Sequence, residues 1–333
     1  MSDGGAAHGD WGVVLVNTGT PDAPQSGAVR RYLRRFLSDP RVIEAPRWFW
    51  LPLLNAVILP LRAPRSAAKY CSVWLEEGGP LNVYSRRLGE ALTRELHAAV
   101  GAVPVQVAYL YSRPGVGAAF ATLARAGVRR IALLPLFPQM SGTTTGAVYD
   151  QAGAALAHTR AVPELRLLAD YALDRGYIEA LAASVRDHWR THGRGAHLLL
   201  SFHGIPLSYA RAGDVYGERC RATAAALAAA LDLADDSWTL AFQSRFGPAK
   251  WLGPSTAETL RALSGRGVRS LDVLCPGFAV DCLETLEEIA IAGREIFLHA
   301  GGERYAYIGA LNAQVAHARA LAALLLDATR DWR

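Results

Sequence analysis

The chain has 333 residues, of which 51% are apolar and 20% are charged, and this composition excludes a disordered protein. It is too long for one ordinary hydrophobic core, so two domains are expected. The net charge of +5 comes almost entirely from arginine, without a long basic tract or an aromatic RNA-binding motif, which argues against nucleic acid as a partner. A mild positive charge favours anionic small molecules or anionic lipid.

Short apolar segments alternate with alanine-rich stretches along the chain. In chain order, the expected strands are 12–17, 105–110, 131–136, 165–168, 197–202, 239–243, 271–274 and 304–308. The expected helices are 84–100, 115–125, 175–191, 216–231, 254–263 and 282–292, followed by a last one at about 315–328. This alternation is typical of parallel βαβ units, and near-continuous apolar strands predict sheets covered on both faces.

The longest apolar stretch is Trp48–Leu61, which contains two prolines and an asparagine. It is too short and too interrupted to span a bilayer. One interpretation is a buried helix–loop element. The other is an apolar lip with a cationic rim, because arginines lie at positions 47, 62 and 65. Such a lip would suit a large, flat, hydrophobic ligand with carboxylates, or peripheral contact with a membrane.

Two segments of the chain resemble each other, Gly127–Leu134 and Gly267–Leu274. Many helix–turn–strand units share this pattern, but the match also fits a duplication. It predicts an α/β protein with two Rossmann-like, doubly wound domains, whose parallel sheets face a central cleft. We place the first domain at residues 1–163, with the lip at about 46–65, and the second at 164–311. The C-terminal helix, about 312–330, is expected to pack back on the first domain.

A histidine follows the apolar strand at 197–202. His203 stands where the chain enters a Gly-Ile-Pro turn, and ligands of parallel α/β sheets bind beyond the carboxyl ends of the strands. Imidazole titrates close to neutral pH, so His203 can serve as a base or as a neutral metal ligand. The alternative is a histidine that only caps the strand through a backbone hydrogen bond.

Three carboxylates follow the strand at 271–274. Asp281, Glu284 and Glu288 have helical spacing and would line one face of the next helix. The helix dipole accounts for the first two but leaves Glu288 unexplained. In a cleft, such a file could pass protons or a cation, and imidazole with oxygen ligands suits Fe²⁺ or Zn²⁺. On a solvated helix face, the same residues would have no such role.

The cysteines and the polar loops exclude other chemistry. The four cysteines, at 71, 220, 275 and 282, form no Cys-x-x-Cys pair, and Met1–Asp10 lacks the apolar core of a signal peptide. We therefore expect the reducing cytoplasm, without disulfides or a cysteine zinc site. The threonine-rich loop at 141–146 lacks a Walker lysine, and the turn at 19–21 lacks a dinucleotide fingerprint, so a phosphate-bearing cofactor is not expected.

Several separated motifs together resemble one family, the ferrochelatases, which insert Fe²⁺ into a porphyrin. They are LVNTGTP at 15–21, YLRRFLSDP at 32–40, LPLR at 59–62, KY at 69–70, LFPQ at 136–139, the threonine-rich loop, SFHG at 201–204, FQSRFG at 242–247, WLGP at 251–254 and CPGFAVDCLETLEE at 275–288. They cover nearly the whole chain. The resemblance implies a chelatase-like pair of Rossmann-like domains. It also implies a lyase that makes protohaem from protoporphyrin IX, with release of two protons, in the last step of haem biosynthesis.

The resemblance also implies roles for single residues. His203 and Glu284 would be the catalytic residues and iron ligands, with His203 accepting pyrrole protons. Asp281 and Glu288 would lie behind Glu284 on a metal or proton path. The porphyrin-binding candidates are Arg62, Tyr111, Phe137, Thr144 and Trp251, with Arg62 meeting a propionate. Fe²⁺ would be a substrate, no cofactor would be tightly bound, and a C-terminal [2Fe–2S] cluster is not expected because no cysteine follows Cys282.

The resemblance implies protoporphyrin IX as substrate, because this stretch is apolar in the branch of the family that uses protoporphyrin and reduced in the branch that uses coproporphyrin. The lip also allows peripheral membrane contact of a cytoplasmic protein. The alternatives are a coproporphyrin III ferrochelatase, another tetrapyrrole chelatase, or a non-catalytic porphyrin or haem carrier. The chain departs from the family pattern at four positions, namely Gly79 for serine, Leu110 for arginine, Met140 for tyrosine and Val215 for proline. Arg113 is a candidate to compensate for the arginine absent at 110.

Overall fold

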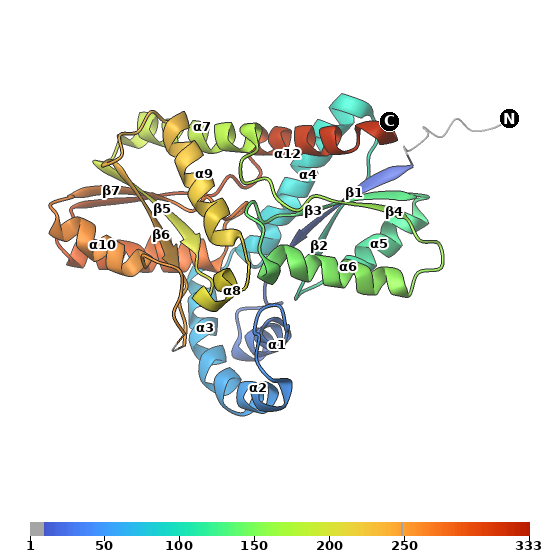
Figure 1. The fold of residues 1–333 in the computed structure, drawn as a ribbon, viewed down its shortest axis with the longest axis horizontal. Coiled ribbons are helices and arrows are strands. Elements are labelled where there is room, and N and C mark those ends of the chain that lie inside the picture. The colour runs from blue at the N-terminus through green and yellow to red at the C-terminus, as the bar shows by residue number, and fades with distance from the viewer. Residues whose placement is uncertain (1–9, 248) are drawn as a thin grey trace.

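Two four-stranded parallel sheets form the frame of the protein, which is a computed structural model describing residues 10–247 and 249–333 (Figure 1). The first sheet has the order β2-β1-β3-β4 and the second β6-β5-β7-β8. The strands are β1 (Trp11–Asn17), β2 (Val105–Tyr109), β3 (Arg130–Pro135), β4 (Glu164–Leu167), β5 (His197–His203), β6 (Trp238–Gln243), β7 (Ser270–Leu274) and β8 (Arg304–Ile308). The segment Met1–Asp10, which was expected to lack a signal peptide, lies outside the described residues except for Asp10.

All eight expected strands form, each within one residue of its expected ends. β1 is buried at every position because helices cover both faces of its sheet, as its unbroken apolar run predicts. The chain order reverses beside the first strand of each sheet, between β1 and β3 and between β5 and β7. Ligands of doubly wound sheets bind at the carboxyl ends of the strands at this switch point. The predicted α/β fold with two doubly wound parallel sheets is confirmed.

Helices flank both sheets. They are α1 (Ser26–Leu37), α2 (Arg47–Leu53), α3 (Leu59–Val73), α4 (Pro80–Val100), α5 (Val116–Arg125), α6 (Ala147–Ala157), α7 (Arg175–His192), α8 (Leu207–Arg211), α9 (Tyr216–Ala230), α10 (Thr256–Gly265), α11 (Arg294–His299) and α12 (Val315–Ala328). Three segments are π-helical, η1 (Leu54–Ile58), η2 (Gly142–Gly146) and η3 (Glu284–Gly293), and η4 (Arg330–Trp332) is a 3₁₀ turn. Among the described residues, no helix has both the length and the apolarity that crossing a membrane requires.

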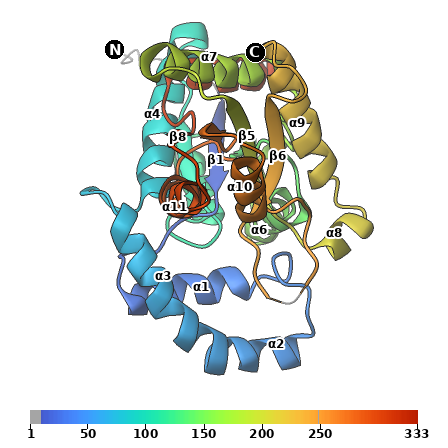
Figure 2. The same cartoon turned by 90° about the vertical axis from the view of Figure 1, so that its left-hand side faces the viewer.

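The helices α1, α2 and α3 stand together beside the two sheets (Figures 1 and 2). The predicted apolar lip is helical throughout, because α2 continues through the π-helical η1 into α3. Leu54 and Leu59 are buried, whereas Trp48 is 81% exposed and Leu61 is 59% exposed. The interpretation as a buried helix–loop element is therefore wrong for the outer side chains of this segment, which project into solvent.

The last helix, α12, packs against α4 of the first half and α7 of the second. Arg319 Nε contacts Glu95 Oε2 at 3.2 Å, and Trp332 Nε1 donates to Glu164 Oε1 at 2.8 Å. One core cluster includes residues of both sheets, such as Leu15 and Leu200. The two halves thus share apolar core, and the domain boundary at 163/164 stays a prediction.

Candidate active site

The residues with chemical side chains gather at the carboxyl ends of β5, β6 and β7. His203 ends β5 and pairs in register with Gln243, the last residue of β6. The loop after β7 leads to Glu284, the first residue of η3. Because β5 and β7 flank the switch point of the second sheet, this is the position where a doubly wound fold binds its ligand.

The ring of His203 is oriented by the backbone. Nδ1 lies 2.6 Å from the carbonyl oxygen of Gly204, and a carbonyl only accepts, so Nδ1 carries the proton. In the neutral ring the lone pair then resides on Nε2. The backbone contact that would suffice for a strand cap therefore also fixes the tautomer that a base or metal ligand needs.

Gln243 couples the histidine strand to the carboxylate helix, although its side chain was not among the predicted site residues. Its Nε2 donates to the carbonyl oxygen of Glu284 at 3.0 Å, and its Oε1 accepts from Ser201 Oγ at 2.8 Å. Gln243 is buried, so both of its polar ends are held in the interior. The motif FQSRFG contained this residue, but only the tertiary contacts reveal what it joins.

The carboxylate segment is a π-helix from Glu284 to Gly293, so its side chains do not follow the α-helical spacing expected from the sequence. In a π-helix, where bonds run from i to i+5, Glu284 and Glu288 lie on neighbouring positions of one face. Asp281 precedes the helix. Glu288 accepts hydrogen bonds from the backbone nitrogen of Ser244 at 2.7 Å and from its hydroxyl at 2.5 Å.

Asp281 is buried and fully engaged in hydrogen bonds. It accepts from the hydroxyls of Thr285 at 2.9 Å and Tyr307 at 2.6 Å, and from Asn312 Nδ2 at 2.7 Å. The backbone nitrogen of Ala310 is a fourth donor, at 3.3 Å. These bonds tie the start of η3 to the segment after β8, so the carboxylate serves as an anchor for the element that carries Glu284.

Side chains of the α1–α3 group surround Glu284 from the other side. Tyr32 and Tyr70 are buried, and burial is the main reason why the pKa of each hydroxyl is raised; the charge of Glu284 raises both further. Burial lowers the pKa of the Arg62 guanidinium, and Glu284 partly opposes that shift. Glu284 therefore lies where the helices beside the lip approach the second sheet.

Two of the predicted porphyrin-binding residues share one aromatic cluster. The Arg62 guanidinium lies 5.1 Å from the centre of the Phe246 ring, and that ring lies 4.9 Å from the ring of Trp251. In the part of the chain that the structure describes, Arg62 has no carboxylate within ion-pair distance. A half-buried guanidinium stacked on an aromatic ring and lacking a carboxylate partner is suited to receive an anion.

The other three candidates lie in the first half. Tyr111 is buried, donates its hydroxyl to Asp39 Oδ2 at 2.8 Å, and packs its ring 5.1 Å from Phe36. Phe137 is partly buried against the same core. Thr144 is half-buried in η2, with its hydroxyl 3.5 Å from the carbonyl oxygen of Ser141. The hydroxyl of Tyr111 is thus already committed to a protein partner.

The surroundings of Gly79 and Leu110, two positions where the chain departs from the family pattern, are occupied by other residues of this chain. A Cβ at Gly79 would lie 2.5 Å from Thr20 Oγ1, so Thr20 fills the space that a serine side chain would need. Leu110 is buried, and its carbonyl oxygen accepts from Gln151 Nε2 at 2.9 Å. Arg113, the candidate replacement for the arginine absent at 110, is exposed.

Comparison with known proteins decides the family. The ferrochelatase family model matches residues 10–329. A ferrochelatase of Aeromonas hydrophila is 49% identical over 94% of this chain and 97% of its own length. One from Klebsiella pneumoniae is 53% identical over 92% of this chain and 94% of its own length.

The chain belongs to the ferrochelatase family. It is therefore a lyase of haem biosynthesis that inserts iron into a porphyrin, as the motifs predicted. The comparisons favour neither another tetrapyrrole chelatase nor a non-catalytic carrier. Iron is a substrate here, and no group of three or more His, Cys, Asp or Glu side chains is placed to hold a resident metal ion within residues 10–247 and 249–333.

Solved structures with low sequence identity show the same fold. SirB from Bacillus subtilis, solved with Fe³⁺, matches with a TM-score of 0.54 and 14% identity over 76% of this chain and 94% of that chain. CbiX, described as the terminal enzyme for siroheme biosynthesis in denitrifying bacteria, has a TM-score of 0.50 and 16% identity. That match covers 94% of this chain and 98% of CbiX. The chelatase-like fold is confirmed.

Proposed function

We propose that the porphyrin substrate is protoporphyrin IX, which this enzyme converts with Fe²⁺ into protohaem and two protons in the last step of haem biosynthesis. The observation that carries the proposal is the exposed apolar surface of the lip, with Arg62 at its edge. Trp48, Phe49 and Leu61 expose apolar side chains, and Arg62 has no carboxylate partner among the described residues. An exposed apolar surface of this extent suits a macrocycle that is apolar except for two propionates better than one with four carboxylates.

In this proposal His203 is the base and, with Glu284, contacts the iron. Its Nε2 lone pair accepts a proton from a pyrrole N–H, while the contact of Nδ1 with Gly204 keeps the ring in the required tautomer. The four pyrrole nitrogens then bind Fe²⁺, and the two protons leave through His203 and solvent. Glu284 binds the entering cation. Glu288 follows it along η3, and Asp281 supports the metal path by holding the start of that helix.

A planar porphyrin hides its nitrogen lone pairs in the ring plane. A cleft that holds the ring bent exposes those lone pairs to the cation and the N–H groups to the base, so binding energy is used to approach the transition state. Trp251 and Phe137 supply faces for the ring, Arg62 pairs with a propionate, and Tyr111 and Thr144 complete the proposed pocket from the first half.

We also propose that the protein is cytoplasmic and touches a membrane surface through the lip. Trp48 and Phe49 are 81% and 54% exposed at the outer end of the lip, directly after Arg47 in the sequence. Apolar rings beside cationic side chains bind at the boundary of anionic bilayers. Sedimentation with vesicles containing anionic lipid should fall when Trp48 and Phe49 are replaced by serine, and equal sedimentation of both proteins would contradict the contact.

The test of the function is anaerobic insertion of Fe²⁺ into protoporphyrin IX, followed in the visible spectrum of the porphyrin. We expect turnover by the wild type, its loss in His203→Ala and in Glu284→Ala, and wild-type rates for His299→Ala, an exposed histidine of α11. Coproporphyrin III assayed at the same concentration should react more slowly. Faster reaction with coproporphyrin III would overturn the substrate, and full activity of His203→Ala would overturn its role.

A further inference from the structure

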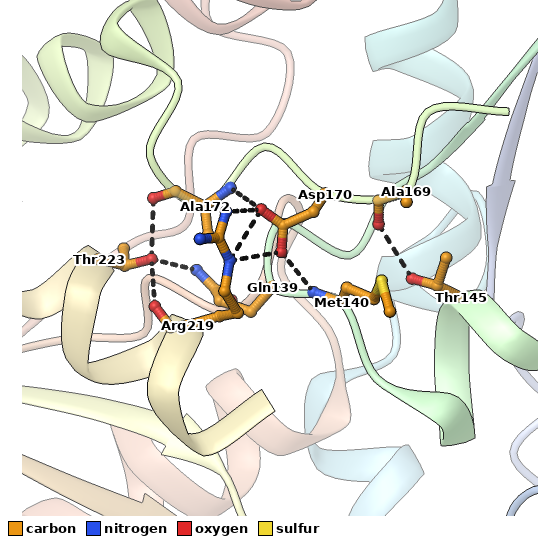
Figure 3. Close-up of polar contacts among 8 residues, drawn as sticks. All are labelled: Gln139, Met140, Thr145, Ala169, Asp170, Ala172, Arg219 and Thr223. Carbon is orange, nitrogen blue, oxygen red and sulfur yellow. Dashed lines mark hydrogen bonds and ion pairs between the residues drawn. The ribbon is translucent and has the colours of Figure 1, made fainter. Parts of the chain in front are cut away.

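A polar cluster joins the two halves on the side of the threonine-rich loop (Figure 3). Asp170, in the segment between β4 and α7, accepts two hydrogen bonds from Arg219 Nε, at 3.0 and 3.1 Å, and its Oδ1 also contacts Arg219 Nη2. The same carboxylate accepts from the backbone nitrogens of Met140 at 3.0 Å and Ala172 at 3.1 Å. One carboxylate thus binds the loop after β3 and helix α9 at once.

Neighbouring contacts extend this connection. Gln139 Nε2 donates to Thr223 Oγ1 at 3.0 Å, and Thr223 Oγ1 donates to the carbonyl oxygen of Ala172 at 2.9 Å. Thr145 donates to the carbonyl oxygen of Ala169 at 3.3 Å. The threonine-rich loop is therefore bonded at both of its ends to the segment that carries Asp170 and, through Gln139, to α9 (Figure 3).

A second carboxylate holds the same loop from the second half. Asp214, just before α9, accepts from Ser141 Oγ at 2.7 Å and from the backbone nitrogen of Gly142 at 2.9 Å. It also accepts from the backbone nitrogen of Tyr216 at 2.9 Å. Three consecutive residues, Met140 and the first two of the loop, are in this way bonded to carboxylates outside the loop.

The cluster also contacts the segments that carry the proposed catalytic residues. Gln139 Nε2 lies 3.3 Å from the carbonyl oxygen of Pro276, in the break between β7 and η3. A Cβ at Gly277 would lie 3.3 Å from Gln139 Oε1 and 3.2 Å from the ring of Phe202. The loop of the first half therefore rests against the approach to Glu284, and Gly277 in that approach lies against Phe202, the residue before His203.

We propose that Asp170 and Arg219 are positioning residues that set the separation between the threonine-rich loop and the segments carrying His203 and Glu284. The inference rests on the proposed roles of those two residues. A carboxylate–guanidinium contact through two nitrogens fixes direction as well as distance, which a single contact does not. Burial alone would raise the pKa of Asp170, but the bonds from Arg219 and the two backbone nitrogens outweigh it and hold that pKa below its usual value.

The test compares this pair with a second pair of the same chemistry inside one half. Asp272 of β7 is buried and accepts from Arg304 Nη1 at 3.1 Å, Trp189 Nε1 at 2.7 Å and the backbone nitrogen of Gly195 at 2.7 Å. Asp170→Asn removes a partly buried charge and Asp272→Asn a buried one, and both keep the side-chain shape. Both substitutions should lower the thermal midpoint, so thermal stability alone does not distinguish a positioning residue from a purely structural one.

The two variants should differ in catalysis. Because displacing reacting groups by about 1 Å can cost up to about 100-fold in rate, we expect Asp170→Asn to lower kcat for iron insertion by about 10-fold or more. Porphyrin affinity should change less than kcat, and the Soret band of bound metal-free porphyrin should shift toward that of porphyrin in detergent, as the ring is held less bent. Asp272→Asn should keep the wild-type kcat and Soret position below its thermal midpoint.

The inference is overturned if Asp170→Asn keeps the wild-type kcat and Soret band, or if Asp272→Asn loses kcat equally. Should Asp170→Asn fail to fold, Arg219→Lys keeps the charge but cannot make the fork contact, and the same loss of kcat with a folded protein is expected. Wild-type kcat in Arg219→Lys would likewise overturn the inference. Activity retained by His203→Ala would instead contradict the proposed function, so the two failures are distinguishable.

Discussion

The buried histidine of α12 should make folding stability depend on pH. His317 has no exposed surface, and its Nδ1 contacts the carbonyl oxygen of Asn312 at 2.7 Å. Its Nε2 has no hydrogen-bond partner among residues 10–247 and 249–333, and its ring lies 6.0 Å from that of Tyr177. Burial disfavours the charged ring and lowers the pKa of His317 from 6.5 to about 4, although the bond to Asn312 acts in the opposite direction.

The direction in which pH changes the free energy of unfolding depends on whether the folded or the unfolded state binds the proton more readily. Above pH 6.5 the ring is neutral in both states and has no effect. Between pH 6.5 and 4 the unfolded chain binds a proton that the folded protein excludes, so the free energy of unfolding falls as the pH falls. At about 1.4 kcal/mol for each unit of pKa, the shift from 6.5 to about 4 corresponds to a loss of about 3 kcal/mol, complete below pH 4.

The measurement is urea unfolding of the wild type and His317→Gln at several pH values from 7.5 to 4.5. Glutamine can still donate to Asn312 but does not titrate, so subtracting the two curves removes the carboxylates that titrate in the same range. We expect the free energy of unfolding of the wild type to fall by about 2–3 kcal/mol relative to that of the variant as the pH falls across this range. His299→Gln, at an exposed histidine of α11, should show no such trend. A difference between wild type and His317→Gln that stays constant with pH would refute the reasoning.

Three further predictions concern packing and charge. Gly79→Ser should lower the free energy of unfolding by about 1–3 kcal/mol, because the new side chain would overpack against Thr20. Adding Thr20→Ala should restore the thermal midpoint. An unchanged midpoint in Gly79→Ser alone would contradict this prediction. Trp332→Ala removes a buried ring that lies 4.5 Å from the Arg166 guanidinium, so about 3–5 kcal/mol should be lost in denaturant unfolding, and a loss below about 1 kcal/mol would disprove the packing role. Arg62→Met should weaken binding of protoporphyrin IX, by fluorescence titration, but not of its dimethyl ester; equal weakening of both ligands would exclude a propionate contact.

The strands could be predicted because each is a local apolar run bounded by Gly, Pro or polar residues, and a strand covered on both faces needs little else. The helix α1 was not predicted, although it has a helical pattern. Its buried residues repeat at the helical period but are separated by arginines that dominate the local composition; they are Ala28, Val29, Tyr32, Leu33 and Leu37. Its partner surface on α3 comes from another part of the chain.

In the candidate site, too, some features could be predicted from the sequence and others could not. The motifs pointed to His203 and Glu284, because a histidine at a strand end and a carboxylate at a helix start are visible in the sequence. The π-helical form of η3 could not be predicted, because its local sequence is also compatible with an α-helix. The aromatic side chain of Tyr111 was predicted to face the porphyrin, but its hydroxyl bonds to Asp39, a residue far away in the sequence.

The sequence by itself determined the eight strands, the family and the residue types at the ends of the strands, because these depend on local pattern and on side-chain chemistry. Only the tertiary structure decided how the sheets are ordered, which tautomer His203 adopts, and that Thr20 fills the space beside Gly79. It alone also brought Asp170 to Arg219. These features depend on contacts between residues distant along the chain, and such contacts exist only once both halves have folded against each other.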